Sequence, residues 1–296
     1  MSLSNPTRGL LLGALGVFVF AITIPMTRLA IGPIEAPQLT PGFVAMGRAA
    51  VAGLLSIAYL RITGARRPTL HEAKWLLLTA LGVVFGWPLL LGLAVQRVDA
   101  IHAAVVTGVL PLATASMGAL ILRQRPSLGF WACALAGLAL VMGFAAWRGA
   151  GGLQLGDLLL LGAVLATSCG YVTGARLALA MRPEQVISWL LVLCLPVTLP
   201  MALWLAPQGP ISAAAWGGFA YVSLFSMWLG FFAWYRALAL GGTLRVSQVQ
   251  VIQPFISMLM AVPLLGERLD AMTLVFALAV IAVVWMGKRM PVDVSR

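Results

Sequence analysis

One charged residue lies well inside a long apolar stretch of the chain. Arg48 interrupts the run that extends from Pro41 to Arg61. Inserting a charged side chain at the centre of a membrane span costs roughly 2.5–3.5 kcal/mol of free energy. Arg48 is therefore a candidate for a specific functional or structural role. The guanidinium could bind a substrate carboxylate through two parallel hydrogen bonds. It could instead cap backbone carbonyls or extend to the lipid headgroups, and both alternatives stay open.

Polar residues and prolines share one face of another apolar stretch. Thr107 and Pro111 are four residues apart, and Gln250 and Pro254 repeat this pair 143 positions later, followed by Ser257. Such spacing places each set on one helix face. A proline also leaves a carbonyl of the preceding turn without its donor. We expect paired kinks beside a central cavity, with close packing of helices as the alternative.

Aromatic side chains could form the apolar part of this cavity. Thr23 and Tyr171 occupy corresponding places 148 residues apart, and Tyr171 can stack on a substrate ring or donate a hydrogen bond. Trp87 and Trp228 lie further from the ends of their stretches than the other tryptophans, which fit the usual interfacial position. We expect both tryptophans to line the pocket, with an interfacial position as the alternative. For Tyr171 the alternative is an interhelical hydrogen bond.

The sequence lacks the motifs of a catalytic centre. It has no GxSxG, HExxH or P-loop pattern, so we expect no enzyme activity, no metal or other cofactor and no direct use of ATP. The acidic residues lie in loops or at the ends of apolar stretches, and His102 is expected at the surface. Because proton antiport needs an ionisable group in the membrane, movement down the substrate's own gradient is favoured over proton exchange.

The composition excludes a soluble fold. Of 296 residues, 61% are hydrophobic and 9% are charged, whereas soluble domains carry roughly 25% charged residues. The net charge of +11 therefore indicates loops held against anionic lipid rather than nucleic acid. The expected partners are membrane lipid and a small-molecule substrate, and we expect a monomer.

Ten apolar stretches are long enough for membrane-spanning helices, which need about 20 residues. The first resembles a signal peptide, but nine more follow, so it is interpreted as the first helix. The fold is thus an all-α polytopic membrane protein, with spans at 8–31, 41–61, 74–96, 100–122, 128–148, 156–180, 185–205, 212–236, 245–265 and 270–288.

Basic residues set the orientation. With both termini on one side, most of the 19 Lys and Arg residues fall on that side. The opposite side holds only Arg28, Arg97, Arg148 and Arg268. The positive-inside rule then places both termini in the cytoplasm, and the inner membrane of a bacterium is the expected location.

The correspondences between the two halves predict two repeats, 1–150 and 151–296. Because each holds five spans, the second must cross the membrane in the opposite sense. The charges agree: Arg123-Gln124-Arg125 follows the fourth span on the cytoplasmic side, whereas Gly266-Glu267-Arg268 follows the ninth on the other. Inverted repeats are typical of transporters that bind substrate near the midplane, where the repeats meet.

This layout resembles the drug/metabolite transporter superfamily. Gln253-Pro254-Phe255 followed by Leu265-Gly-Glu-Arg-Leu269 is similar to the EamA-type repeat, and the likeness covers essentially the whole chain. The first repeat departs from it, with Arg123-Gln124 where the pattern has Gly-Glu. The four-helix multidrug pumps are similar in fold, but this chain lacks the membrane carboxylate on which they depend. Among the members, bacterial amino-acid exporters, including exporters of aromatic amino acids, are the most similar.

We therefore expect an alternating-access exporter of small metabolites. The third, fourth, eighth and ninth spans should surround the cavity, the first, second, sixth and seventh should gate it, and the fifth and tenth should be peripheral. The alternatives are a proton-coupled exporter of organic cations, which would need an acidic group or an aromatic cage, a passive channel, and a membrane-embedded enzyme.

Overall fold

The computed structural model describes residues 5–121, 125–149, 152–178, 180–241, 248–290 and 292–293. In these residues, eight helices are long and apolar enough to cross a membrane, and two shorter apolar helices, 249–265 and 271–287, follow them. Each predicted span thus coincides with a helix, and the all-α fold is confirmed. The boundary between the expected repeats, at residues 150 and 151, lies outside the described residues.

Several spans consist of more than one element. The first half contains α1 (Asn5–Ile31), α2 (Pro41–Ile62), α3 (Leu70–Ala80), the π-helical η1 (Leu81–Gly86), α4 (Trp87–Val95), α5 (Ala100–Thr107), α6 (Leu110–Ile121), β1 (Arg125–Pro126) and α7 (Leu128–Arg148). The second half contains α8 (Leu155–Leu177), α9 (Pro183–Trp204), α10 (Ala213–Tyr221), the π-helical η2 (Val222–Leu229), α11 (Gly230–Gly241), the 3₁₀-helical η3 (Gln248–Ile252), α13 (Gln253–Leu265), α14 (Ala271–Arg289) and β2 (Val292–Asp293). The two short strands pair antiparallel.

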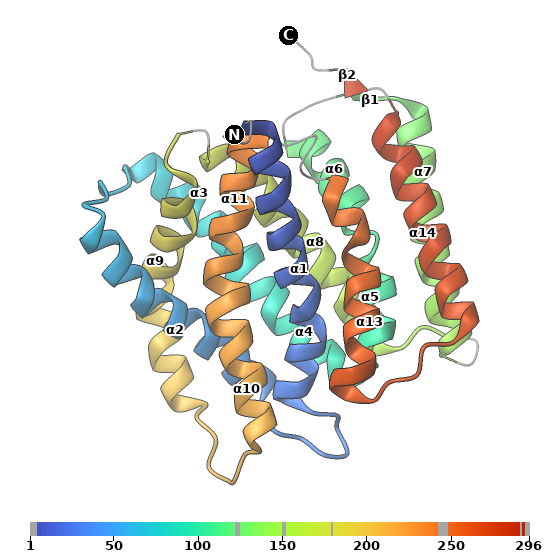
Figure 1. Ribbon diagram of the computed structural model, residues 1–296, viewed down its shortest axis with the longest axis horizontal. Helices are drawn as coiled ribbons and strands as arrows, with labels where there is room; N and C mark the ends of the chain where they lie inside the picture. Colours follow the sequence, from blue (N-terminus) through green and yellow to red (C-terminus); the bar gives the residue numbers. More distant parts are fainter. Residues whose placement is uncertain are drawn as a thin grey trace.

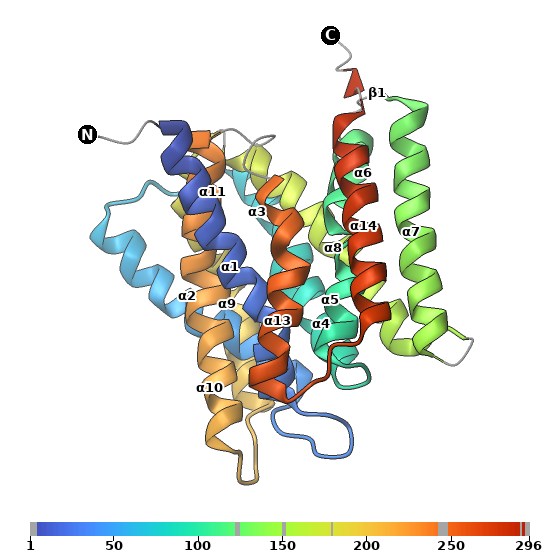
Figure 2. The same ribbon diagram turned by 45° about the vertical axis from the view of Figure 1, so that its right-hand side comes forward.

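The spans run up and down between two ends of the bundle. The helix α1 begins, and α14 ends, at the upper end in Figure 1, which we call the N/C end. The turned view in Figure 2 shows the same arrangement. The loop after α13 lies at the opposite, far end, whereas β1 lies at the N/C end. The strand β1, which follows the fourth span, and the loop after the ninth span therefore lie at opposite ends of the bundle.

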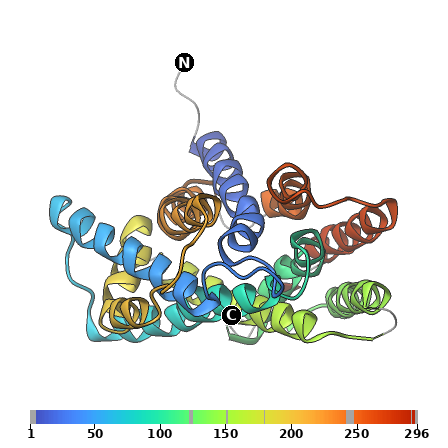
Figure 3. The ribbon, with the colours of Figure 1, turned by 90° about the horizontal axis from the view of Figure 1, so that it is seen from below.

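Helix contacts follow a twofold pattern. The helix α1 packs against α11 and α13, and its counterpart α8 packs against α4 and α6. The other two large contacts, between α2 and α9 and between α7 and α14, each join a helix to its own counterpart. Seen from below in Figure 3, α1 and α8 lie centrally, and α7 and α14 lie together at one edge. The fifth and tenth spans are thus peripheral, as predicted.

The helical irregularities are also duplicated. The π-helical segments η1 and η2 occupy corresponding parts of the third and eighth spans. The fourth span breaks at Gly108 and Val109, between α5 and α6, and the ninth contains η3 at the corresponding place. Pro111 and Pro254 are each the second residue of the helix that follows, so the predicted prolines lie at paired interruptions of the two spans.

Small residues allow the central helices to approach closely. A Cβ added to Gly82 of η1 would lie 2.2 Å from the Ala166 carbonyl oxygen of α8, and one added to Gly218 of α10 would lie 2.6 Å from the Met26 carbonyl oxygen of α1. Close backbone contact replaces the hydrophobic effect as the source of helix association in lipid. Large apolar side chains such as Leu77, Leu165 and Trp204 remain on the outer surface, where acyl chains would cover them.

Candidate functional site

A small cavity lies at the centre of the bundle, where spans from both halves meet. The free space in it is about 20 Å³, room for roughly one water molecule. Side chains from seven spans line it: Phe20, Thr23, Arg48, Val83, Trp87, Leu110, Thr167, Tyr171, Ser226, Met227, Phe231 and Gln253. The first, second and sixth spans, expected to gate, thus also contribute to the lining.

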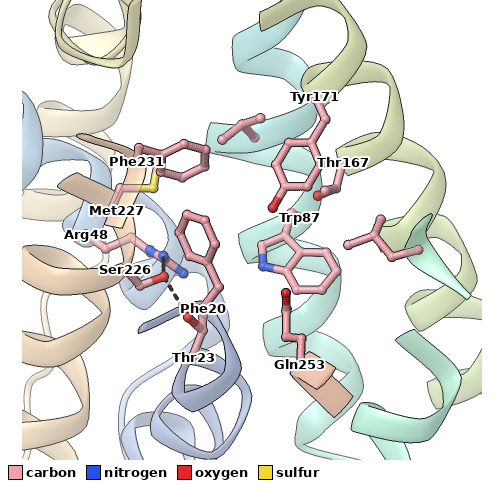
Figure 4. Close-up of a pocket in the computed structure, with 12 residues that line it drawn as sticks. Phe20, Thr23, Arg48, Trp87, Thr167, Tyr171, Ser226, Met227, Phe231 and Gln253 are labelled. Carbon is pink, nitrogen blue, oxygen red and sulfur yellow. Dashed lines mark hydrogen bonds between the residues drawn. The ribbon is translucent and has the colours of Figure 1, made fainter. Parts of the chain in front are cut away.

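One wall of the central cavity is polar. Nη2 of Arg48 donates a hydrogen bond to Oγ of Ser226 at 2.8 Å, and Oγ1 of Thr23 donates to the same oxygen at 2.8 Å (Figure 4). Arg48 is only 2% exposed. Its Nε and Nη1 atoms have no hydrogen-bond partner among the described residues. Because a buried charge without partners is costly, these two donors are suited to an anion entering the cavity.

The opposite wall is aromatic. Trp87 of α4 and Tyr171 of α8 face the polar wall, with Phe20 of α1 between the two walls in the view of Figure 4. Phe231 packs edge-on against Tyr171, with ring centroids 6.5 Å apart. An apolar or aromatic side chain could therefore be held on this side while a charged group faced Arg48.

A second cavity adjoins the first, next to the two helix irregularities. It has about 10 Å³ of free space and shares Leu110 and Gln253 with the central cavity. Its other lining residues are Ile24, Thr107, Gly108, Pro111, Gln250, Pro254 and Ser257. The side chains of Gln250 and Ser257 are buried. Nε2 of Gln250 and Oγ of Ser257 have no partner in the described part of the chain.

The two cavities bring together nine of the ten residues that the sequence singled out. Thr23, Arg48, Trp87 and Tyr171 line the first, and Thr107, Pro111, Gln250, Pro254 and Ser257 line the second. Trp228 is the exception: it lies outside both cavities and packs on Phe232 at 5.1 Å between ring centroids. Arg48 points to the cavity and not to lipid headgroups, which removes that alternative.

Sequence reasoning missed several lining residues. Ser226, which binds Arg48, lies in η2, where a π-turn alters the usual helical spacing. Gln253 precedes Pro254 in the Gln-Pro-Phe motif, and only this adjacency could have indicated it. Phe20 and Phe231 look like ordinary apolar helix residues in the sequence, so nothing could have separated them from lipid-facing ones.

The expectation that His102 lies at the surface is wrong. It is 5% exposed, and its Nε2 lies 2.6 Å from Oδ1 of Asp157, which is 1% exposed. Asp157 belongs to the first turn of α8 and also accepts a hydrogen bond from the Gln154 backbone N–H at 2.8 Å. Helix α5 packs against α8 and α7, and this packing covers the imidazole, as the contact of its ring with Phe144 shows.

Glu267, in the turn between α13 and α14, holds the start of the fourth span. Its carboxylate oxygens accept hydrogen bonds from the backbone N–H groups of Ala100 and Ile101 at 2.7 and 2.8 Å. Burial raises the pKa of this carboxyl, and the two N–H donors partly offset the effect. The acidic turn thus caps a helix N-terminus of the other half. The corresponding Arg123 and Gln124 lie outside the described residues.

Comparisons with known proteins agree with this architecture. The model of the EamA-like transporter family matches the chain twice, over residues 7–145 and 154–286. This chain belongs to the EamA-like transporter family. It is 40% identical over 289 residues to the uncharacterized transporter YdeK of Bacillus subtilis (strain 168). The alignment covers 97% of this chain and 99% of that protein.

A solved structure has the same fold as this EamA-like transporter. A crystal structure of a protein with 19% sequence identity superposes with a TM-score of 0.65, covering 95% of this chain and 96% of the other. At this identity the likeness supports the fold alone. The family and the apolar helices together establish a multi-pass membrane transporter, which would bind a small-molecule substrate.

Proposed function

We propose that this transporter exports small amphipathic metabolites, in particular amino acids with apolar or aromatic side chains, by alternating access. The N/C end would face the cytoplasm of a bacterial cell from its inner membrane. The chain would act as a monomer of two inverted repeats, 1–150 and 151–296, without cofactor or catalysis. Transport would run down the substrate's own gradient.

The contrast between the two walls of the central cavity supports this substrate class. Arg48 offers two unpartnered guanidinium nitrogens, and the facing wall offers Trp87 and Tyr171. A ligand with one carboxylate and one apolar side chain complements both walls at once. An organic cation would find no carboxylate among the described residues that line either cavity.

Binding can be tested on the purified transporter with a panel of amino acids and organic cations. A true ligand raises the melting temperature once its concentration exceeds Kd, and the stabilisation grows with the logarithm of concentration over Kd. We expect leucine or phenylalanine to stabilise the protein and to exchange in counterflow across proteoliposomes. Stabilisation by lipophilic cations without any response to amino acids would contradict the proposal and favour a drug exporter.

Proton-coupled export is a second candidate, and one observation favours it. The contact between His102 and Asp157 provides a buried ionisable pair at the junction of the fourth and sixth spans. A pH gradient imposed on vesicles decides between the two candidates. Gradient-driven export predicts no uphill accumulation, whereas uphill accumulation that His102→Gln abolishes would establish proton coupling.

A further inference from the structure

The break in the fourth span deprives two backbone carbonyls of their usual i+4 donors. Pro111 has no N–H to donate to Thr107, four residues earlier. The N–H of Leu112 donates to the Val109 carbonyl at 3.0 Å, so the carbonyl of Gly108 loses its usual i+4 donor. The carbonyl of Thr107 thus lacks its i+4 donor, and no hydrogen bond from a described residue to the carbonyl of Gly108 is present. Both residues are buried in the middle of a span.

The loss of these donors matters, because each unmade hydrogen bond in a membrane interior costs free energy. Both residues line the second cavity, and so does Gln250, whose carbonyl loses its own i+4 donor at Pro254. Two unpartnered side chains, Gln250 and Ser257, are buried beside them. The two interrupted spans thus bring to one small space carbonyls that lack their i+4 donors and two side chains with an unpartnered polar atom.

The chemistry of this space is that of an acceptor site. Carbonyl oxygens and the Ser257 hydroxyl accept hydrogen bonds. The unpartnered atom of Gln250 is Nε2, a donor, and rotation of the amide by 180° would replace it with the acceptor Oε1. Among the described residues that line it, none carries a charged side chain. An ammonium group, which has three donors and a positive charge, fits such a ring of dipoles. Broken helices of transporters hold cations through unwound carbonyls on the same physical basis.

The position of the acceptor site relative to Arg48 identifies the cation. The second cavity adjoins the first through Leu110 and Gln253, so a ligand whose carboxylate faces Arg48 can extend its other polar group to the interrupted helices. We propose that the second cavity is the ammonium subsite of a zwitterionic substrate. The inference rests on the proposed function, and it adds the requirement that the substrate carry a free amino group.

Matched ligands test this requirement. Phenylalanine, phenylpropanoate, which lacks the amine, and phenethylamine, which lacks the carboxylate, would be titrated against the full-length transporter by thermal shift, together with the corresponding leucine series. We expect the amino acid to bind at least about tenfold more tightly than its deaminated analogue, since a hydrogen bond to a charged group commonly contributes this much. Equal affinity of the two would overturn the proposal.

Substitution of Pro111 tests the carbonyls themselves. Pro111→Ala supplies an N–H that can bind the Thr107 carbonyl and close the helix, so the tenfold preference for the amine should fall to about twofold or less. Binding of phenylpropanoate should not change. Pro196→Ala is the matched control, because Pro196 lies within α9, away from both cavities, and it should keep the full preference. Should Pro111→Ala fail to fold, Ser257→Ala should lower the same preference.

Two outcomes separate the possible failures. If neither the phenylalanine nor the leucine series stabilises the wild-type protein, the proposed substrate class fails and the subsite with it. If amino acids bind but Pro111→Ala and Ser257→Ala both retain the preference for the amine, only the subsite is wrong. Stabilisation by sodium chloride over choline chloride that Pro111→Ala abolishes would assign the carbonyls to Na⁺, which also overturns the ammonium assignment.

Discussion

The two walls of the central cavity come from equivalent backbone but differ in chemistry. The polar wall, formed by α1, α2 and η2, holds Thr23, Arg48 and Ser226, and the aromatic wall, formed by α8, η1 and α4, holds Tyr171 and Trp87. The helix α9, which corresponds to α2, contributes no residue to either cavity and has no arginine within it. The two halves therefore share a backbone geometry, and under the proposed function the differences between them would supply recognition.

Removing the charge of the polar wall should have the largest effect. We expect Arg48→Ala to weaken binding of a carboxylate ligand at least about 100-fold, because it removes a charge-assisted bidentate contact. Arg48→Lys keeps the charge but loses the planar fork, so its loss should be intermediate. Counterflow in proteoliposomes measures both, and unchanged exchange by folded Arg48→Ala would show that both walls recognise only apolar groups.

The aromatic wall should control selectivity between side chains. Trp87→Ala should lower the preference for phenylalanine over alanine by about tenfold, in line with the contribution of an aromatic contact beyond its buried area. Trp228→Ala provides a matched control, since Trp228 lies on the equivalent span outside both cavities. Competition assays would reveal the difference, and equal effects of the two substitutions would assign Trp87 to packing.

Removing the neighbours that hold Arg48 in place should have a smaller effect on ligand affinity. Ser226→Ala removes the acceptor of both hydrogen bonds in the polar wall, and we expect ligand affinity to fall about fivefold because the guanidinium loses its anchor. Thr23→Val leaves the contact between Arg48 and Ser226 in place and should cost less. The titrations used for Arg48→Ala would show the order, and a larger loss in Thr23→Val would contradict it.

The acidic cap should affect stability without changing selectivity. Glu267→Gln retains one acceptor oxygen but places an amide N–H group against a backbone donor of α5. We expect it to lower stability by about 1–3 kcal/mol, visible as a lower melting temperature with unchanged ratios of ligand affinities. The exposed Glu35, changed to Gln, serves as the control. Altered selectivity in Glu267→Gln would show that the cap belongs to recognition.

Much of the fold could be predicted because lipid imposes a length on every span. Uncharged runs gave the ten helices, and the 143-residue offset between Pro111 and Pro254 indicated the paired kinks. Depth along a span could also be estimated, but the direction of a side chain could not. In η2 a wider turn shifts the following residues around the helix, so Ser226 faces the cavity whereas Trp228, at similar depth, turns away.

Contacts between distant spans were beyond sequence reasoning. His102 was expected at the surface because it lies near the end of its span, yet Asp157 from the sixth span covers it. Likewise, nothing near Glu267 in the sequence indicates that its partners are N–H groups of Ala100 and Ile101, in the other half. Such pairs depend on the arrangement of helices, which hydrophobic patterns do not encode.

The small volume of the two cavities bears on ion leakage across the membrane. The two cavities offer about 20 and 10 Å³, which is too little for a continuous file of water across the bilayer. Without such a file, the two cavities give hydrated ions no continuous path through the described part of the protein. A cell could therefore hold many copies of the protein in its membrane without dissipating the voltage and ion gradients that drive its other transporters.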